Sequence, residues 1–136
     1  MSQASDYLED KLLDHVLRNT AFTSPTTVYV GLFTAVTNLE NNNVGSASEV
    51  ANSNGYARVA ATFSAASSGS ITTSGNITFA AANGGDFGTI THIAILDSNT
   101  HGSGNVLFYG ALTTSKTIQD GDTFQITTGN LTVTLD

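Results

Sequence analysis

The sequence predicts a mainly β fold: an antiparallel β-sandwich of the jelly-roll or immunoglobulin-like kind, with about seven or eight short strands after one N-terminal amphipathic helix. Three observations favour it. Apolar residues recur at helical spacing within 5–18, they alternate with a period of two after Thr26, and turn dipeptides such as Asp120-Gly121 separate the alternating runs. The 136 residues suit a single domain, 1–136, with the sandwich in 26–136.

The segment 5–18 is expected to form the helix. Ser5 is a suitable N-cap because its hydroxyl oxygen can accept from an unpaired backbone N–H of the first turn. Arg18 lies where the helix dipole favours a cation, and Asn19 can leave the helix in a left-handed conformation. An apolar stripe runs along one face, so we expect it to be buried against the chain's own sandwich or against a neighbour. The stripe consists of Leu8, Leu12, Leu13, Val16 and Leu17.

The remaining elements are expected to be strands. In the first of them Val28, Val30 and Leu32 share one face while Tyr29 and Phe33 share the other. Because both faces are apolar, this strand is expected at the centre of a sheet. The strands are expected within residues 26–34, 55–64, 70–80, 89–97, 106–113, 122–127 and 130–136.

A long polar loop is expected at 37–55, and loops of that length usually bind something or contact a neighbour. Asn41, Asn42 and Asn43 offer hydrogen-bond donors and acceptors without charge, and Glu40 and Glu49 could reach basic residues on a neighbour. The alternative is a disordered surface loop. On either interpretation, replacing residues 40–50 by a short Gly/Ser linker is expected to leave the fold intact.

The charge balance excludes several classes of partner. Eleven acidic residues against four basic ones give a formal net charge of -7. Nucleic acids and anionic membrane surfaces both need clustered cations, so neither is an expected partner. The N-terminus shows no secretory signal pattern, and no apolar run approaches the ~20 residues of a membrane span. Charged residues make up only 11%, and such a weakly charged surface suits contacts between subunits.

No catalytic residues, cofactor or metal are predicted, and the protein is not expected to be an enzyme. His15, His92 and His101 lack the spacing of a metal site, and no G-x-S-x-G nucleophile motif is present. Asp120-Gly121-Asp122 is interpreted as a hairpin turn, because two carboxylates are too few for calcium.

A carbohydrate site needs an exposed aromatic platform surrounded by polar groups. The chain contains no tryptophan, and Tyr29, Tyr56 and Tyr109 all fall inside expected strands. Packing in a core or an interface explains these tyrosines more simply.

The chain resembles a family of small bacteriophage virion structural proteins. The segments SDYLEDKLLDHVLRNTAFTSPTTVYVGLFTA, GYARVAATF, GDFGTITHIAILD and GNVLFYGALTTSKTIQDGDTFQITTGNLTVTLD carry the resemblance, which spans nearly the whole chain apart from the loop at 37–55. Such sequences are often labelled tail-fibre-like. Others of similar size and character are capsid cement, or decoration, proteins that commonly form trimers on the outside of the head shell.

The resemblance implies a structural role in the virion, after assembly in the host cytoplasm. Its main implication is a capsid cement protein that docks on and stabilises the head shell; the alternative is a tail-fibre or baseplate module that contacts the host, with carbohydrate as a candidate receptor. The implied partners are the protein itself, as a homotrimer, and the major capsid protein or another virion protein. The candidate interface residues are Leu8, Leu12, Val16, Glu40, Asn41, Asn42, Asn43 and Glu49.

Overall fold

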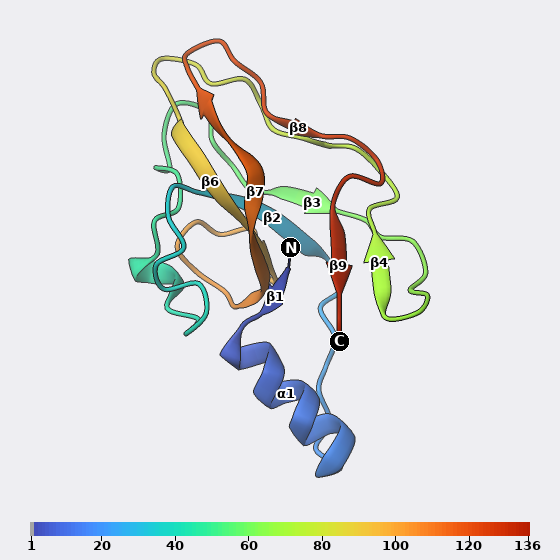
Figure 1. Ribbon diagram of the computed structural model, residues 1–136. Coiled ribbons are helices and arrows are strands. Elements are labelled where there is room, and N and C mark those ends of the chain that lie inside the picture. The colour runs from blue at the N-terminus through green and yellow to red at the C-terminus, as the bar shows by residue number, and fades with distance from the viewer. Residues whose placement is uncertain (1) are drawn as a thin grey trace.

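The computed structural model describes residues 2–136 and shows a mainly β architecture with antiparallel strands and one α-helix in that range (Figure 1). The elements are β1 (Gln3–Ala4), α1 (Asp6–Leu17), β2 (Val28–Phe33), a 3₁₀ turn η1 (Val44–Ser46), β3 (Val59–Ala61), β4 (Ser70–Thr72), β5 (Ile77–Thr78), β6 (Gly88–Leu96), β7 (Val106–Ile118), β8 (Gln125–Ile126) and β9 (Thr132–Thr134). The predicted fold class is thereby confirmed.

The main sheet has five strands in the order β1-β7-β6-β2-β3. β2 lies between β6 and β3, as its two apolar faces predict, and Val30, Leu32 and Phe33 are fully buried there. The second layer consists of two separate ribbons, β4-β9 and β5-β8, in place of a continuous second sheet. The arrangement is therefore sandwich-like, with one sheet faced by two short hairpin-like pairs.

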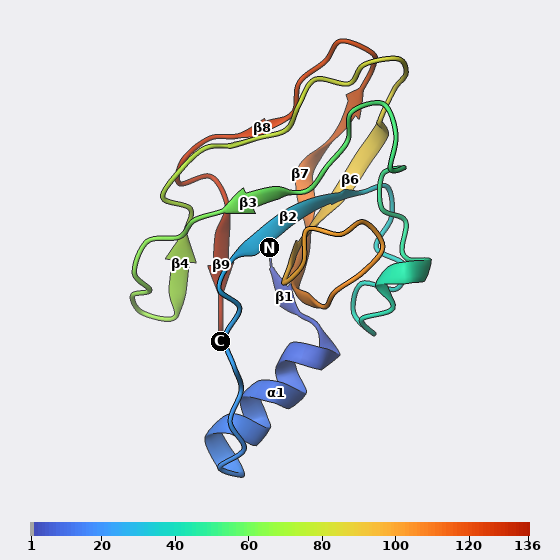
Figure 2. The ribbon, with the colours of Figure 1, turned by 180° about the vertical axis from the view of Figure 1, so that it is seen from behind.

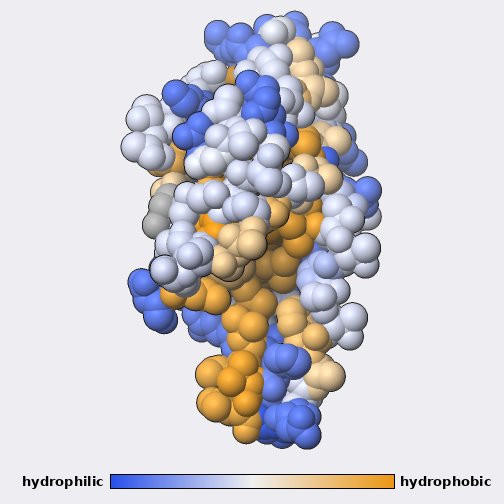
Figure 3. Space-filling view, turned by 90° about the vertical axis from the view of Figure 1, so that its right-hand side faces the viewer, coloured by the Kyte–Doolittle hydropathy of each residue, from blue (hydrophilic) through white to orange (hydrophobic). Residues whose placement is uncertain are grey.

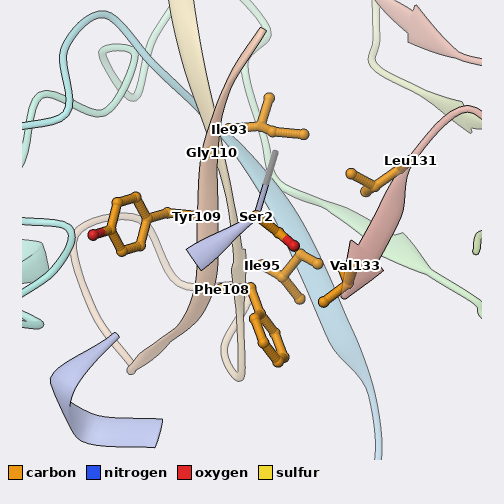
Figure 4. Close-up of a pocket in the computed structure, with 8 residues that line it drawn as sticks. All are labelled: Ser2, Ile93, Ile95, Phe108, Tyr109, Gly110, Leu131 and Val133. Atoms are coloured by element: carbon orange, nitrogen blue, oxygen red, sulfur yellow. The ribbon is translucent and has the colours of Figure 1, made fainter. Parts of the chain in front are cut away.

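The larger core lies between the main sheet and these ribbons. Figure 4 shows Leu131 and Val133, at β9, pointing toward Ile93 and Ile95 of β6. The space that these side chains line measures about 10 Å³, close to the smallest that can hold one water molecule. The ribbon therefore packs against the sheet at Leu131 and Val133, while a wider opening remains toward β4.

A smaller core covers the opposite face of the sheet, where Phe33 and Leu96 lie. The segment 37–55 supplies the cover, because Leu39 and Val44 pack against them and are 0% and 4% exposed. In Figures 1 and 2 this teal segment lies beside the orange loop that joins β6 to β7. The expectation of a purely polar surface loop at 37–55 is therefore wrong. Single apolar residues spaced among asparagines have no periodicity by which they could be recognised.

Helix α1 forms where the sequence predicts it. The Leu8 N–H donates to the Ser5 hydroxyl oxygen at 3.3 Å, and Asn19 follows the helix with a left-handed φ of 52°. Ser5 is itself buried, with its hydroxyl donating to the Val106 carbonyl. No helix in residues 2–136 is long and apolar enough to cross a membrane.

The apolar stripe of α1 is buried only at its N-terminal end. Leu8 belongs to the larger core and Leu12 is half-buried against it, whereas Leu13, Val16 and Leu17 are 57%, 72% and 75% exposed. Of the two expected alternatives, burial against the chain's own sandwich therefore holds for the N-terminal end of the stripe and not for Leu13, Val16 and Leu17. The reason is geometric: the first turn of α1 is anchored at β1 and β7, and the helix then runs away from the sheet (Figure 1).

Candidate interface surfaces

The exposed end of α1 forms an apolar patch. We call Leu13, Val16 and Leu17 the helix-tip patch. Figure 3 shows apolar atoms gathered at this end of the molecule, with hydrophilic side chains beside them. The polar flank of the helix includes Asp14, which forms an exposed ion pair with Arg18 at 2.9 Å. Large aliphatic side chains this exposed are commonly covered by a partner.

A second apolar surface lies on the body of the molecule. It is a cavity of about 160 Å³ between the main sheet and the β4-β9 ribbon, which we call the ribbon cavity. Its lining contains only apolar side chains. Ile95, Leu107 and Val133 are buried, and Val28, Phe63, Ile71 and Phe108 are half-buried.

Residue Glu49, a candidate interface residue, is engaged inside the chain. Its side chain is 2% exposed and makes a two-pronged ion pair with Arg58, whose side chain is 0% exposed. The Arg58 Nε donates to Glu49 Oε1 at 2.7 Å and its Nη2 donates to Oε2 at 2.8 Å. Arg58 Nη1 also donates to the carbonyls of Ser98 and Ser103, which ties the 37–55 segment to the β6-β7 loop. Glu49 is therefore not free to reach a neighbour.

The surroundings of Glu49 keep it ionised. Burial alone would raise the pKa of Glu49. The hydrogen bonds from Arg58 and from the Gly102 N–H, together with the positive charge of Arg58, outweigh this effect, so the pKa lies below its usual value of 4.5. Tyr56 donates its hydroxyl proton to Glu49 Oε1 at 2.9 Å. Burial and the adjacent Glu49 charge raise the pKa of Tyr56 far above its usual range, so Tyr56 stays protonated. This network links the 37–55 segment, Arg58 and the β6-β7 loop by buried and half-buried hydrogen bonds.

We expect the Glu49 ion pair to make stability depend on pH in the acid range. Because folding lowers the pKa of Glu49, the pair stabilises the folded state fully above the usual value of 4.5. That contribution is lost as the pH falls through the lowered pKa of the folded state, since Glu49 then binds a proton. Thermal melts should show the Tm of the parent falling more steeply in this range than that of Glu49→Gln, which cannot titrate there. The same pH dependence in both proteins would contradict this role.

The other candidate loop residues divide between internal and exposed roles. Asn42 is internal: its Oδ1 accepts from the Val106 N–H at 2.7 Å and its Nδ2 donates to Asn105 Oδ1 at 2.8 Å. Glu40, Asn41 and Asn43 are exposed. These three remain accessible to a partner.

The histidines serve local contacts. His15 Nδ1 accepts from the Phe22 N–H at 3.2 Å, and His101 Nε2 donates to the Val50 carbonyl at 2.8 Å. His92 lies 2.8 Å from the Thr91 hydroxyl, and burial lowers its pKa. Throughout residues 2–136, no group of three or more His, Cys, Asp or Glu side chains is placed to hold a metal ion.

Tyr29 and Tyr109 lie in β2 and β7 as expected, but Tyr56 precedes β3 and lies in no strand, so the expectation is wrong for Tyr56. Tyr56 and Tyr109 are both 5% exposed, but Tyr29 is half-buried and lines an open groove with Tyr7 and Phe22. No local pattern predicts this grouping, because Tyr7 lies in α1, Phe22 follows the helix and Tyr29 lies in β2. The carboxylate in the groove, Asp97, already accepts from the Asn105 backbone and side chain at 2.7 and 2.8 Å.

An antiparallel β body that exposes an apolar helix end and an apolar cavity is typical of a protein that assembles with others. The family model described as "Podophage GP4 fiber I protein gp80" matches residues 3–134, nearly the whole chain. The chain therefore belongs to this family of phage fibre proteins, and its role is that of a virion structural protein. This confirms the resemblance noted from the sequence. A comparison with curated proteins found no match.

Proposed function

We propose that this protein is a tail-fibre component of a bacteriophage virion, incorporated during assembly in the host cytoplasm. The observation that carries the proposal is the match of residues 3–134 to a family described as a podophage fibre protein. The fibre description favours the tail over the head, so the alternative drawn from the resemblance is preferred to capsid cement.

The proposed role is structural and does not include catalysis. Two apolar surfaces, the helix-tip patch and the ribbon cavity, support contacts with other protein chains. Low charge content supports the same role, because few charges would have to lose their hydration at an interface. We propose that the protein binds copies of itself, with a homotrimer as the expected form, and docks on another virion protein. A symmetric oligomer multiplies weak contacts, so none of them has to be strong.

Location and copy number on the particle test this function. Purified virions are labelled with gold-conjugated antibody and, in parallel, the band of this protein is quantified against the major capsid protein. A tail-fibre component should label the tail and occur in a small multiple of the tail symmetry. Label spread over the head, with a copy number close to that of the capsid subunits, would overturn the proposal in favour of a decoration protein.

A further inference from the structure

We propose that the helix-tip patch of one copy inserts into the ribbon cavity of another copy. This inference rests on the self-association proposed above and specifies the surfaces that make it. The two surfaces are the convex and the concave apolar features of the same chain. Each contact would remove Leu13, Val16 and Leu17 from water and fill an opening that the chain itself leaves partly empty.

The sizes of the two surfaces agree. The ribbon cavity measures about 160 Å³. An apolar cavity of roughly 150 Å³ can hold a molecule as large as benzene, so this one can accept an aliphatic side chain of the helix tip. All its lining side chains are apolar, so insertion leaves no polar lining side chain without a hydrogen bond. Figure 3 shows the apolar end of the helix and, above it, a second apolar area on the body.

The extent of the patch argues against the simplest alternative, in which two helix tips pack on each other. Three aliphatic side chains can bury on the order of 300 Å². A stable interface needs about 800 Å² per partner. When the helix of each copy enters the cavity of another, every copy uses both surfaces, and the sheet and ribbon around the cavity add to the contact. A reciprocal pair or a ring satisfies both surfaces of every copy, whereas an open chain of copies leaves one surface free at each end.

The neutral surroundings of the cavity permit a second copy there, although the net charge of -7 on each copy opposes association. The helix carries carboxylates beside the patch, including Asp10 and Asp14, and an acidic rim would repel them. The chain neighbours of the half-buried cavity residues Phe63 and Ile71 are Thr62, Ser64, Ser70 and Thr72, which carry no charge. Added salt should strengthen this contact by screening the net charge of -7 that each copy carries. Docking on a basic partner would weaken with salt instead.

Cysteine cross-linking tests the contact directly, because the chain has no cysteine of its own. Val16→Cys marks the helix tip, and Ile71→Cys marks the cavity. Equal amounts of the two purified full-length variants are mixed, oxidised and separated on a non-reducing gel. A covalent dimer that forms in the mixture, and much less with either variant alone, is the expected result.

The matched control is Lys11→Cys, which is exposed on the polar face of α1 and should not cross-link to Ile71→Cys. Circular dichroism melts verify that each variant is folded, and Val28→Cys replaces Ile71→Cys if that variant is not. If Val16→Cys alone forms dimers as readily as the mixture, the helix tips contact each other. If no mixture forms a cross-link, the helix tip does not contact the ribbon cavity. Either result overturns the inference. The labelling of virions tests the proposed tail-fibre function without using the cross-linking result, so a failure of one can be told from a failure of the other.

Discussion

Replacing Arg58 by methionine is expected to lower the free energy of unfolding by about 3–5 kcal/mol, one of the largest effects of any single substitution in this protein. The substitution leaves the Glu49 carboxylate buried beside an apolar side chain, without the two hydrogen bonds and the positive charge that it has in the parent. It also removes the donor to the carbonyls of Ser98 and Ser103. Urea denaturation followed by circular dichroism measures the change.

Two further variants isolate the ion pair. Arg18→Met breaks the exposed pair with Asp14 and should cost less than about 1 kcal/mol, which provides a matched control for loss of an arginine. The double variant Arg58→Met/Glu49→Leu removes both buried charges and should recover part of the loss; the rest remains because Tyr56, Gly102 and the two serine carbonyls lose their partners. A cost for Arg58→Met no larger than that for Arg18→Met would show that the buried pair does not hold the two loops together.

Replacing residues 40–50 by a Gly/Ser linker is expected to unfold the protein, contrary to the tolerance that the sequence suggests. The segment contains Val44 and Val50, which are 4% and 3% exposed, and Glu49, whose loss leaves Arg58 buried without its partner. The two lost side chains and the unpaired charge together cost more than about 5 kcal/mol, which is comparable with the whole stability of a typical domain. The measurement is the melting transition by circular dichroism.

A conservative change within the same segment serves as the control. Glu40→Ser together with Asn41→Ser alters only exposed side chains and should change stability by less than about 1 kcal/mol. If the linker variant melted at the temperature of the parent, the second core would not depend on this segment. The position of the 37–55 segment on the sheet would then have no effect on folding.

The candidate interface was predicted from the sequence only in part. The periodicity of residues 5–18 identified Val16 as part of an apolar stripe, and Val16 is indeed exposed and available to a partner. Periodicity could not tell how far along the helix the chain's own core extends, so Leu8 and Leu12 were assigned to an interface although they pack inside. The ribbon cavity could not be predicted, because residues from five separate strands and from the segment after β3 line it.

The helix and its caps, the interior position of β2 and a mainly antiparallel β fold could all be predicted from the sequence. These follow from side-chain spacing and from short-range chemistry at chain positions a few residues apart, and both can be read directly from the order of residues. The cover of the second face of the sheet, the pairing of Glu49 with Arg58 and the location of exposed apolar surface follow from the folded arrangement alone. Those outcomes depend on contacts between distant parts of the chain, such as the 37–55 segment and the β6-β7 loop, whose geometry no local pattern encodes.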